Sequence, residues 1–364
     1  MDASPLFRRF RLKALDLPNR IVMAPMTRRF SPGGVPTPDV ARYYRRRAEG
    51  GAGLIITEGT TIGRRAASND SAIPNFHEMA SLEGWANVVT EVHEAGGRIA
   101  PQLWHQGLVR APGSGPHPDA RSEGPIAAPT GSCAMTDTDI ADTVDAFAIA
   151  AASARQIGFD AVELHGAHGY LIDQFLWSGS NMRVDGYGGG PVERTRFAVE
   201  VVRAVRKAIG PEFPLIFRFS QWKLQDYGAR LARTPEELEQ VLTPLAEAGV
   251  DIFHASTRRF WEPEFPGSDL NLAGWTRKLT HRPTISVGSV GLGGADFTQQ
   301  LLGSSTSAPV GSLDNLLERL ARDEFDLVAI GRALLSDPDW PRKVRDNRRE
   351  ALMPFDKAAL GSLS

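Results

Sequence analysis

Residues 159–176 read FDAVELHGAHGYLIDQFL and place three polar rings directly after a short apolar strand. The first six of these residues alternate in the manner of a buried β-strand. Two imidazoles, His165 and His168, and the phenol of Tyr170 follow within a few positions. In parallel α/β folds, the chemistry takes place at the carboxyl ends of the strands. The stretch therefore predicts a catalytic or binding site at the end of this strand.

Two histidines three residues apart can direct N–H groups at one ligand oxygen, and a nearby tyrosine can supply a proton. His165, His168 and Tyr170 are thus suited to polarising a carbonyl group. Two other interpretations stay open, because a strand-end histidine can be a satisfied structural group and because histidine is the commonest metal ligand. Zinc needs a third protein ligand, and we expect Glu163 to point to the opposite face of the strand from His165. We therefore expect no metal.

The composition bears on the class of protein. The chain has 364 residues, a formal net charge of −2 and interspersed charges, which gives no support for a nucleic-acid partner. Cys133 is the only cysteine, so no intrachain disulfide can form and a cytoplasmic protein is the expectation. The first residues, MDASP, lack the pattern of a secretory signal, and no apolar run has the length of a membrane span. We expect a cytoplasmic protein that binds neither nucleic acid nor membrane.

Short apolar, β-rich runs alternate with longer amphipathic segments. The expected strands are Arg20–Met23, Gly53–Thr57, Arg98–Trp104, Ala161–His165, Leu215–Phe219, Asp251–His254, Thr284–Val287 and Leu327–Ile330. The expected helices are Asp39–Glu49, Leu82–Ala95, Thr143–Gln156, Val192–Ile209 and Thr234–Ala248. Repeated β/α units with continuously apolar strands predict an α/β fold, a closed TIM (β/α)8 barrel, as a single domain over residues 1–364.

Three insertions interrupt the alternation, and the shortest of them, Gly303–Gly311, is a small-residue loop before the last helix and strand. Arg110–Asp139 is rich in Pro, Gly and Ser and has no helical period, so we expect a loop with a hairpin there. Arg258–Leu272 is aromatic and proline-rich and follows the sixth strand, and its first part, Arg258–Pro263, is expected to line a substrate channel. None of these insertions has the composition of a linker that would divide the chain.

Several separated motifs form an ordered set along the chain. They are PNRIVMAPMTR (18–28), PQLW (101–104), HGAHGY (165–170), NMRVDGYGG (181–189), Arg218 and the pair Gly331–Arg332. Their order and spacing, from about Leu6 to Pro341, resemble the Old Yellow Enzyme family of FMN-dependent ene-reductases, which includes the 12-oxophytodienoate reductases. The resemblance implies an FMN-binding barrel with the cofactor across its carboxyl mouth.

The resemblance also implies which residues hold the flavin ring. The ring would rest on the backbone of Ala24, Pro25, Met26 and Thr27, with Gly59 nearby. The Thr27 side chain corresponds to the family position that bonds near the flavin C4 carbonyl and tunes its redox potential; other members carry cysteine there.

Two polar side chains would bind the flavin edge. Gln102 would bind the pyrimidine edge, because a primary amide offers both a donor and an acceptor. Arg218 would sit near N1 and the C2 carbonyl, where negative charge accumulates on reduction. It lies in an otherwise apolar strand, where an unpaired charge would be expensive, so an anionic partner is expected.

The loops after the seventh and eighth strands are expected to bind the FMN phosphate. Such loops commonly hold phosphate through backbone N–H groups in barrels of this type. Here they contain Gly288 and Ser289 in one loop and Gly331 and Arg332 in the other. The glycines allow close approach of the backbone, and Arg332 can add a charge-assisted contact.

The reaction implied by the resemblance is a ping-pong reduction of activated alkenes. NAD(P)H, as NADH or NADPH, reduces FMN and leaves, and an alkene with a carbonyl or nitro group enters the same site. His165 and His168 would hold its oxygen, Trp104 would line the substrate site, and Tyr170 would deliver the proton. The expected partners are these small molecules, and the expected assembly is a monomer or homodimer.

The sequence departs from the family pattern at two places. At the first, where the family usually has Tyr-Gly-Gly-Ser, this chain has Gly190 and then Pro191. At the second, His168 stands where many relatives carry asparagine, so both donors would be imidazoles. Two rival functions remain: a flavin-free phosphate-binding lyase or isomerase, and a noncatalytic ligand-binding barrel. The first usually needs a Schiff-base lysine or a carboxylate base, and none of the expected strands ends at a lysine.

Overall fold

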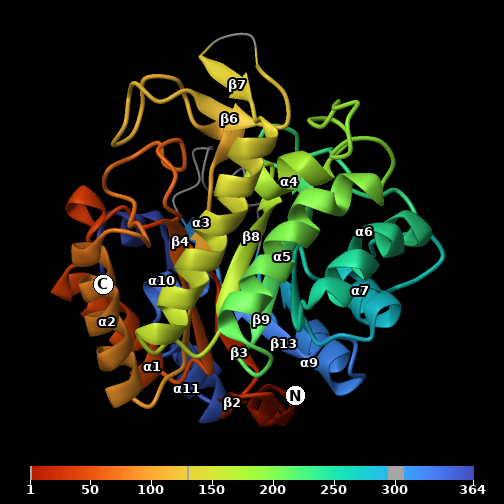
Figure 1. Cartoon of the computed structure of the whole chain (residues 1–364). Coiled ribbons are helices and arrows are strands. Elements are labelled where there is room, and N and C mark those ends of the chain that lie inside the picture. Colours follow the sequence, from red (N-terminus) through yellow and green to blue (C-terminus); the bar gives the residue numbers. More distant parts are fainter. Residues whose placement is uncertain (1, 129–130, 294–306) are drawn as a thin grey trace.

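The computed structural model describes residues 2–128, 131–293 and 307–364, and its centre is a closed barrel of eight parallel strands (Figure 1). The strands follow one another around the barrel in chain order, as the prediction required. They are β3 (Ile21–Met23), β4 (Leu54–Thr61), β5 (Ile99–Trp104), β8 (Val162–His168), β9 (Leu215–Lys223), β10 (Ile252–Ser256), β11 (Thr284–Val287) and β13 (Leu327–Ile330). The predicted (β/α)8 barrel is confirmed.

Helices pack around the outside of the barrel (Figure 1). They are α1 (Pro38–Glu49), α2 (Met79–Glu94), α3 (Asp137–Gln156), α4 (Leu171–Leu176), α5 (Arg196–Ile209), α6 (Pro235–Ala248), α7 (Leu272–Thr280), α9 (Asp314–Ala321), α10 (Arg332–Ser336) and α11 (Trp340–Arg345). Short 3₁₀ turns are η1 (Ser4–Phe7), η2 (Pro32–Gly34), η3 (Gly107–Val109), η4 (Glu193–Thr195), η5 (Arg349–Ala351) and η6 (Lys357–Gly361).

Caps in the sequence explain where two of these helices begin. Thr234 accepts the N–H of Glu237 at the start of α6, where Pro235 occupies the first turn. Helix α3 begins six residues before the predicted Thr143. Thr136 and Asp139 form a reciprocal capping box there, which satisfies two otherwise unpaired N–H groups.

Two apolar cores explain why the strands read as continuous apolar runs. One fills the barrel and includes Val22, Ala161 and Ile216, and the hairpin of β1 (Phe10–Leu12) and β2 (Leu15–Leu17) packs against it. The larger core lies between the strands and the helices and contains the alternate strand residues, such as Val162. Both faces of each strand are thus buried, as parallel barrels require.

The insertion after β5 carries two short strands, β6 (Ser122–Gly124) and β7 (Ser132–Ala134), near the top of Figure 1. The predicted hairpin is wrong, because these strands pair in parallel. Arg183 gives a physical reason. Its Nη1 donates to the carbonyls of Pro125 and Met135, which directly follow the two strands, so both strands end at the same side.

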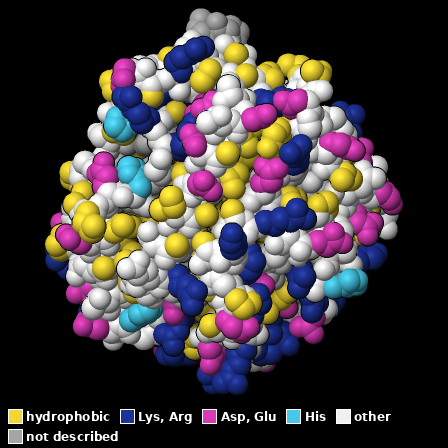
Figure 2. All heavy atoms as spheres, in the orientation of Figure 1, with side chains coloured by type: hydrophobic (Ala, Val, Ile, Leu, Met, Phe, Trp, Pro, Cys, Tyr) yellow, Lys and Arg dark blue, Asp and Glu magenta, His cyan; other side chains and the backbone are white. Residues whose placement is uncertain are grey.

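A third strand pair joins β12 (Ser307–Ala308) to β14 (Phe355–Asp356). On the face drawn in Figure 2, basic and acidic side chains are interspersed over most of the surface. None of the helices in the described part of the chain is long and apolar enough to cross a membrane.

Candidate active site

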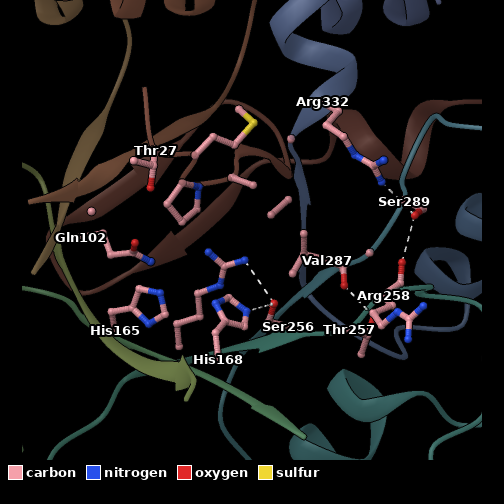
Figure 3. A pocket seen from close by; sticks show the side chains of 18 of the residues that line it. Thr27, Gln102, His165, His168, Ser256, Thr257, Arg258, Val287, Ser289 and Arg332 are labelled. Atoms are coloured by element: carbon pink, nitrogen blue, oxygen red, sulfur yellow. Dashed lines mark hydrogen bonds between the residues drawn. The ribbon is translucent and has the colours of Figure 1, made fainter. Parts of the chain in front are cut away.

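A cavity of about 360 Å³ opens at the carboxyl end of the barrel, within the size range of small-molecule sites (Figure 3). The structure brings every site residue predicted from the sequence to its lining. These are Ala24, Pro25, Met26, Thr27, Gly59, Gln102, Trp104, His165, His168, Tyr170, Arg218, Gly288, Ser289, Gly331 and Arg332. Five of the strands thus contribute their last residues or the loops that follow them.

The two imidazoles and the phenol form a cluster on one wall. The ring centroids of His165 and His168 are 5.0 Å apart, and those of His165 and Tyr170 are 4.9 Å apart. Trp104 meets the Tyr170 ring edge-on at 4.8 Å. These distances leave the three polar groups within reach of one small ligand.

The tautomer of His165 can be assigned from its hydrogen bond. Its Nδ1 accepts the N–H of Ala167 at 3.3 Å, so in the neutral ring the proton lies on Nε2. Burial, and secondarily the positive charge of Arg218, lowers the pKa of His165 well below 6.5. His165 is therefore a neutral N–H donor at pH 7.

His168 is held by an unusual backbone conformation and by two serines. Its φ is +65°, in the left-handed region, at a register shift between β8 and β9. Ser220 Oγ accepts its N–H at 2.9 Å, and its Nε2 lies 2.8 Å from Ser256 Oγ. Ser256 Oγ also accepts a bond from Arg218 at 3.2 Å, and when its own hydrogen points to Nε2, the His168 proton lies on Nδ1.

Burial and Arg218 also lower the pKa of His168 well below 6.5. Both imidazoles are therefore neutral at pH 7. In the described part of the chain, no three His, Cys, Asp or Glu side chains gather where they could hold a metal ion. The pair is better suited to donating hydrogen bonds to a ligand oxygen than to binding a cation.

Tyr170 occupies the N-cap position of α4, where the chain turns from β8 into the helix. Burial raises the pKa of Tyr170 to about 12, opposed by the charges of Arg29 and Arg218. The phenol is therefore a weaker acid than the value of about 10 expected for tyrosine.

Glu163 lies inside the barrel with His165, so the prediction that it points to the opposite face is wrong. Side chains two residues apart on a strand share a face. Its carboxylate is fully buried and accepts from Gln102 Nε2 at 2.8 Å and from His254 Nδ1 at 2.7 Å. Gln102 thereby meets a carboxylate on one side and the cavity on the other (Figure 3).

Gly288, Ser289 and Arg332 line the far end of the cavity (Figure 3). Gly288 and Ser289 have φ values of +152° and +52°, a backbone conformation that residues with a side chain rarely adopt. Arg332 Nη2 donates to Ser289 Oγ at 3.2 Å. Burial lowers the pKa of Arg332 to about 10, far above neutral pH, so this end carries a positive charge.

The remaining wall is the segment from Ala24 to Thr27, which follows β3. Glu58 anchors its continuation, because its carboxylate accepts the backbone N–H groups of Arg28 and Arg29. Gly59 lines the cavity and also makes room for a ring, since a Cβ there would lie 2.6 Å from Trp104 Cε3.

Several lining residues were not predicted as site residues. Trp222 packs on the His168 ring at 4.5 Å, and Ser256, Thr257, Leu224 and Leu360 also face the cavity. Trp222 and Thr257 lie at or just after strand ends, and this position could have predicted them as site residues. Arg258, the first residue of the aromatic insertion, also lies on the lining. The other unpredicted residues of the cavity wall have no local signal in the sequence.

Strand β9 ends at Lys223, so the expectation that no strand ends at a lysine is wrong. The Lys223 ammonium is fully buried and bonds to Asp173 Oδ1 at 2.7 Å and to the carbonyl of Ser220. It does not line the cavity. A Schiff-base role for this lysine therefore has no geometric support.

The family model described as "NADH:flavin oxidoreductase / NADH oxidase family" matches residues 5–301. The chain belongs to this family. The resemblance to the Old Yellow Enzyme family is thereby confirmed, and the expected class, a nicotinamide-dependent flavin oxidoreductase that uses FMN, is the class of the family.

Among its relatives, a NADH oxidase of Thermoanaerobacter brockii is 32% identical over 370 residues and covers 98% of this chain. The 12-oxophytodienoate reductase 7 of Oryza sativa subsp. japonica is 39% identical over 226 residues, which is 57% of this chain. The matches span 53% and 57% of the lengths of these two relatives. A structure of morphinone reductase in complex with tetrahydroNAD has a TM-score of 0.81 at 30% identity, covering 98% of this chain and 93% of that one.

The cavity residues fit the FMN that the family implies. Arg218 is 7% exposed, and its buried Nε has no hydrogen-bond partner among the described residues. Within the described part of the chain, no carboxylate hydrogen-bonds to this buried guanidinium, which favours an anionic or carbonyl-bearing ligand. Gln102 adds an amide at the same wall, and the charge of Arg332 lies at the other end, as a ring with a phosphate tail requires.

Proposed function

We propose that the chain is an FMN-dependent ene-reductase that uses NAD(P)H to reduce the C=C bond of alkenes activated by a carbonyl or nitro group. The family supports a flavin and a nicotinamide. Two relatives are named for 12-oxophytodienoate and for chanoclavine-I aldehyde, and both names denote carbonyl compounds. These names support a carbonyl-bearing substrate for this chain.

The observation that carries the proposal is the cluster of His165, His168 and Tyr170 on one cavity wall, with ring centroids about 5 Å apart. Two neutral imidazoles can donate to one oxygen without bringing a net charge. Hydrogen bonds to that oxygen withdraw electron density from the conjugated alkene. This makes its β-carbon a better hydride acceptor.

The cofactor-binding roles follow from position. Ala24–Thr27 and Gly59 would face the flavin ring, Gln102 and Arg218 would bind its polar edge, and the phosphate would lie against Gly288, Ser289, Gly331 and Arg332. When bound, FMN would supply the two-electron chemistry that links the nicotinamide to the alkene. Trp104 would limit the space beside the two histidines.

Tyr170 is proposed as the proton donor. In the net reaction the alkene gains a hydride at its β-carbon and a proton at its α-carbon, while NAD(P)H becomes NAD(P)⁺. A phenol with a pKa of about 12 can still protonate an enolate-like carbon, which is a stronger base. The histidines hold the oxygen, so Tyr170 remains the acid within reach of the carbon.

The proposal is tested on purified protein. We expect it to be yellow, to release FMN on denaturation, to lose its colour anaerobically with NADPH or NADH, and to regain it with cyclohexenone as cyclohexanone forms. Arg218→Ala should bind FMN more weakly and lower its reduction potential. A colourless wild type that takes up no FMN on reconstitution would overturn the proposal.

We also propose that the chain acts in the cytoplasm as a monomer or homodimer. The single cysteine, Cys133, supports a reducing compartment. Sedimentation of the purified protein and fractionation of cells test these two statements.

A further inference from the structure

We propose that Glu163 is a positioning residue that fixes the orientation of the Gln102 amide, and thereby the donor–acceptor order that the cavity offers to a flavin edge. This inference rests on the proposed function, because its ligand is FMN. Glu163 touches neither the cavity nor any ligand placed in it. It acts through Gln102, which does line the cavity.

The contacts leave one orientation of the amide. Glu163 is completely buried, its Oε1 accepts from Gln102 Nε2 at 2.8 Å, and its Oε2 accepts from His254 Nδ1 at 2.7 Å. An ionised carboxylate only accepts hydrogen bonds, so Gln102 must present its NH₂ group to it. Reversing the amide would set two acceptors against each other in a buried site, which is unfavourable.

A neutral N–H donor and a cation face the same carboxylate. His254 is fully buried, and burial lowers its pKa, so it is a neutral N–H donor to Glu163. Arg218 lies on the neighbouring strand, two positions beyond the partner of Glu163, and faces the same barrel interior. The attraction between its guanidinium and Glu163 opposes the effect of burial on Arg218.

Two consequences follow for a bound flavin. With one N–H committed to Glu163, the Gln102 carbonyl oxygen and the second N–H face the cavity in a fixed order. That order matches an edge where an N–H group stands beside a carbonyl, as at N3 of the flavin. In addition, the positive charge of Arg218 favours the reduced, more negative flavin. Glu163 offsets part of that charge.

Glu163→Gln separates these effects from packing. The amide has the same shape, but it can donate as well as accept, so Gln102 is free to reverse. The probe is N3-methyl-FMN, which lacks the N–H donor, compared with FMN by fluorescence titration of the apoprotein. We expect the wild type to bind N3-methyl-FMN at least about tenfold more weakly, and Glu163→Gln to reduce that ratio several-fold.

The second readout is the flavin reduction potential. Removal of the Glu163 charge leaves Arg218 less compensated, so the potential should become more positive, opposite in sign to the effect of Arg218→Ala. Glu123→Gln is the matched control, because Glu123 is also a buried carboxylate bound to a histidine, but its hydrogen-bond partners, His105 and Arg64, do not line the cavity. Glu123→Gln should change neither the binding ratio of the two flavins nor the reduction potential.

The outcomes differ for the proposed function, for the orientation role and for the charge role. A wild type that binds no FMN overturns the proposed function. A wild type that binds FMN while Glu163→Gln keeps the same binding ratio overturns the orientation role, and an unchanged or more negative potential overturns the charge role. If Glu163→Gln does not fold, Gln102→Met tests the premise that the amide held by Glu163 meets the N3 edge: it should remove the discrimination against N3-methyl-FMN, and retained discrimination overturns the inference.

Discussion

Tyr170 combines close packing with weak acidity. Its ring meets Trp104 and His165 edge-on, and burial raises its pKa to about 12. Tyr170→Phe keeps the ring and removes the acid. In stopped-flow experiments, we expect reduction of bound FMN by the nicotinamide to stay near wild type and reduction of cyclohexenone to fall by about 10²–10⁴.

A nitroalkene is the internal control for Tyr170, because its nitronate product can leave the site and take its proton from water. Its reduction should change much less in the same variant. If cyclohexenone is reduced at the wild-type rate by Tyr170→Phe, the donor is another group.

His165 is predicted to act on the alkene and not on a metal. Its Nε2–H is free to donate because Nδ1 is occupied by the N–H of Ala167. His165→Ala should slow alkene reduction by about 10²–10³, as for other donors to a developing oxyanion. Reduction of FMN by nicotinamide should suffer less. Loss of wild-type activity to a chelator, with recovery on adding zinc, would contradict this assignment.

Individual side chains show where sequence reasoning succeeds and fails. His165, Gln102 and Arg218 could be predicted because each lies at or near the end of a strand expected from the sequence. Glu163 was assigned to the wrong face although strand periodicity alone places it with His165. Ser256 reaches His168 across 88 residues of chain, and such a contact exists only after the barrel closes.

Among the strands and helices, the predicted elements have correct centres and displaced ends. Strands β8 and β9 run beyond the predicted His165 and Phe219, because their pairing resumes past a register shift, where His168 pairs with Lys223. An irregularity of this kind depends on the partner strand and leaves no periodic trace in either sequence. The turn that carries Tyr170 begins at this extension.

The buried ion pair between β9 and α4 should hold that turn in place. Asp173 accepts from Lys223 at 2.7 Å with one oxygen and from the N–H of Gly169 at 2.7 Å with the other. Lys223→Met removes one partner and leaves a buried carboxylate. Urea unfolding should show a loss of about 3–5 kcal/mol.

Lys223→Met/Asp173→Asn is the matched double variant, since asparagine is neutral and can still accept from Gly169. It should recover a substantial part of the lost stability. If the single and double variants are equally unstable, the ion pair is not what stabilises this junction.

For the whole molecule, the buried titratable groups pull the pH dependence of stability in opposite directions. Burial lowers the pKa values of His165 and His168 below 6.5, so the stability linked to them is present above pH 6.5 and is lost as the pH falls. Burial raises the pKa of Glu58 to about 7 against a value of 4.5 when exposed. The contribution of Glu58 to the stability of the fold is fully present below about pH 4.5 and is lost as the pH rises through 7.

Comparing wild type with Glu58→Gln cancels the histidine contributions and isolates that of Glu58. Its Oε1 is buried without a partner in the described part of the chain, and glutamine can still accept the N–H groups of Arg28 and Arg29 through its oxygen. The variant should therefore gain stability relative to wild type between pH 5 and 8, up to about 3 kcal/mol, the value set by a pKa difference of about 2.5. Denaturant unfolding at several pH values measures this, with the exposed Glu239→Gln as control. Parallel curves for wild type and Glu58→Gln would show that the Glu58 carboxyl keeps its ordinary pKa in the folded barrel, and that the loop from Ala24 to Arg29 is held by a charged group at neutral pH.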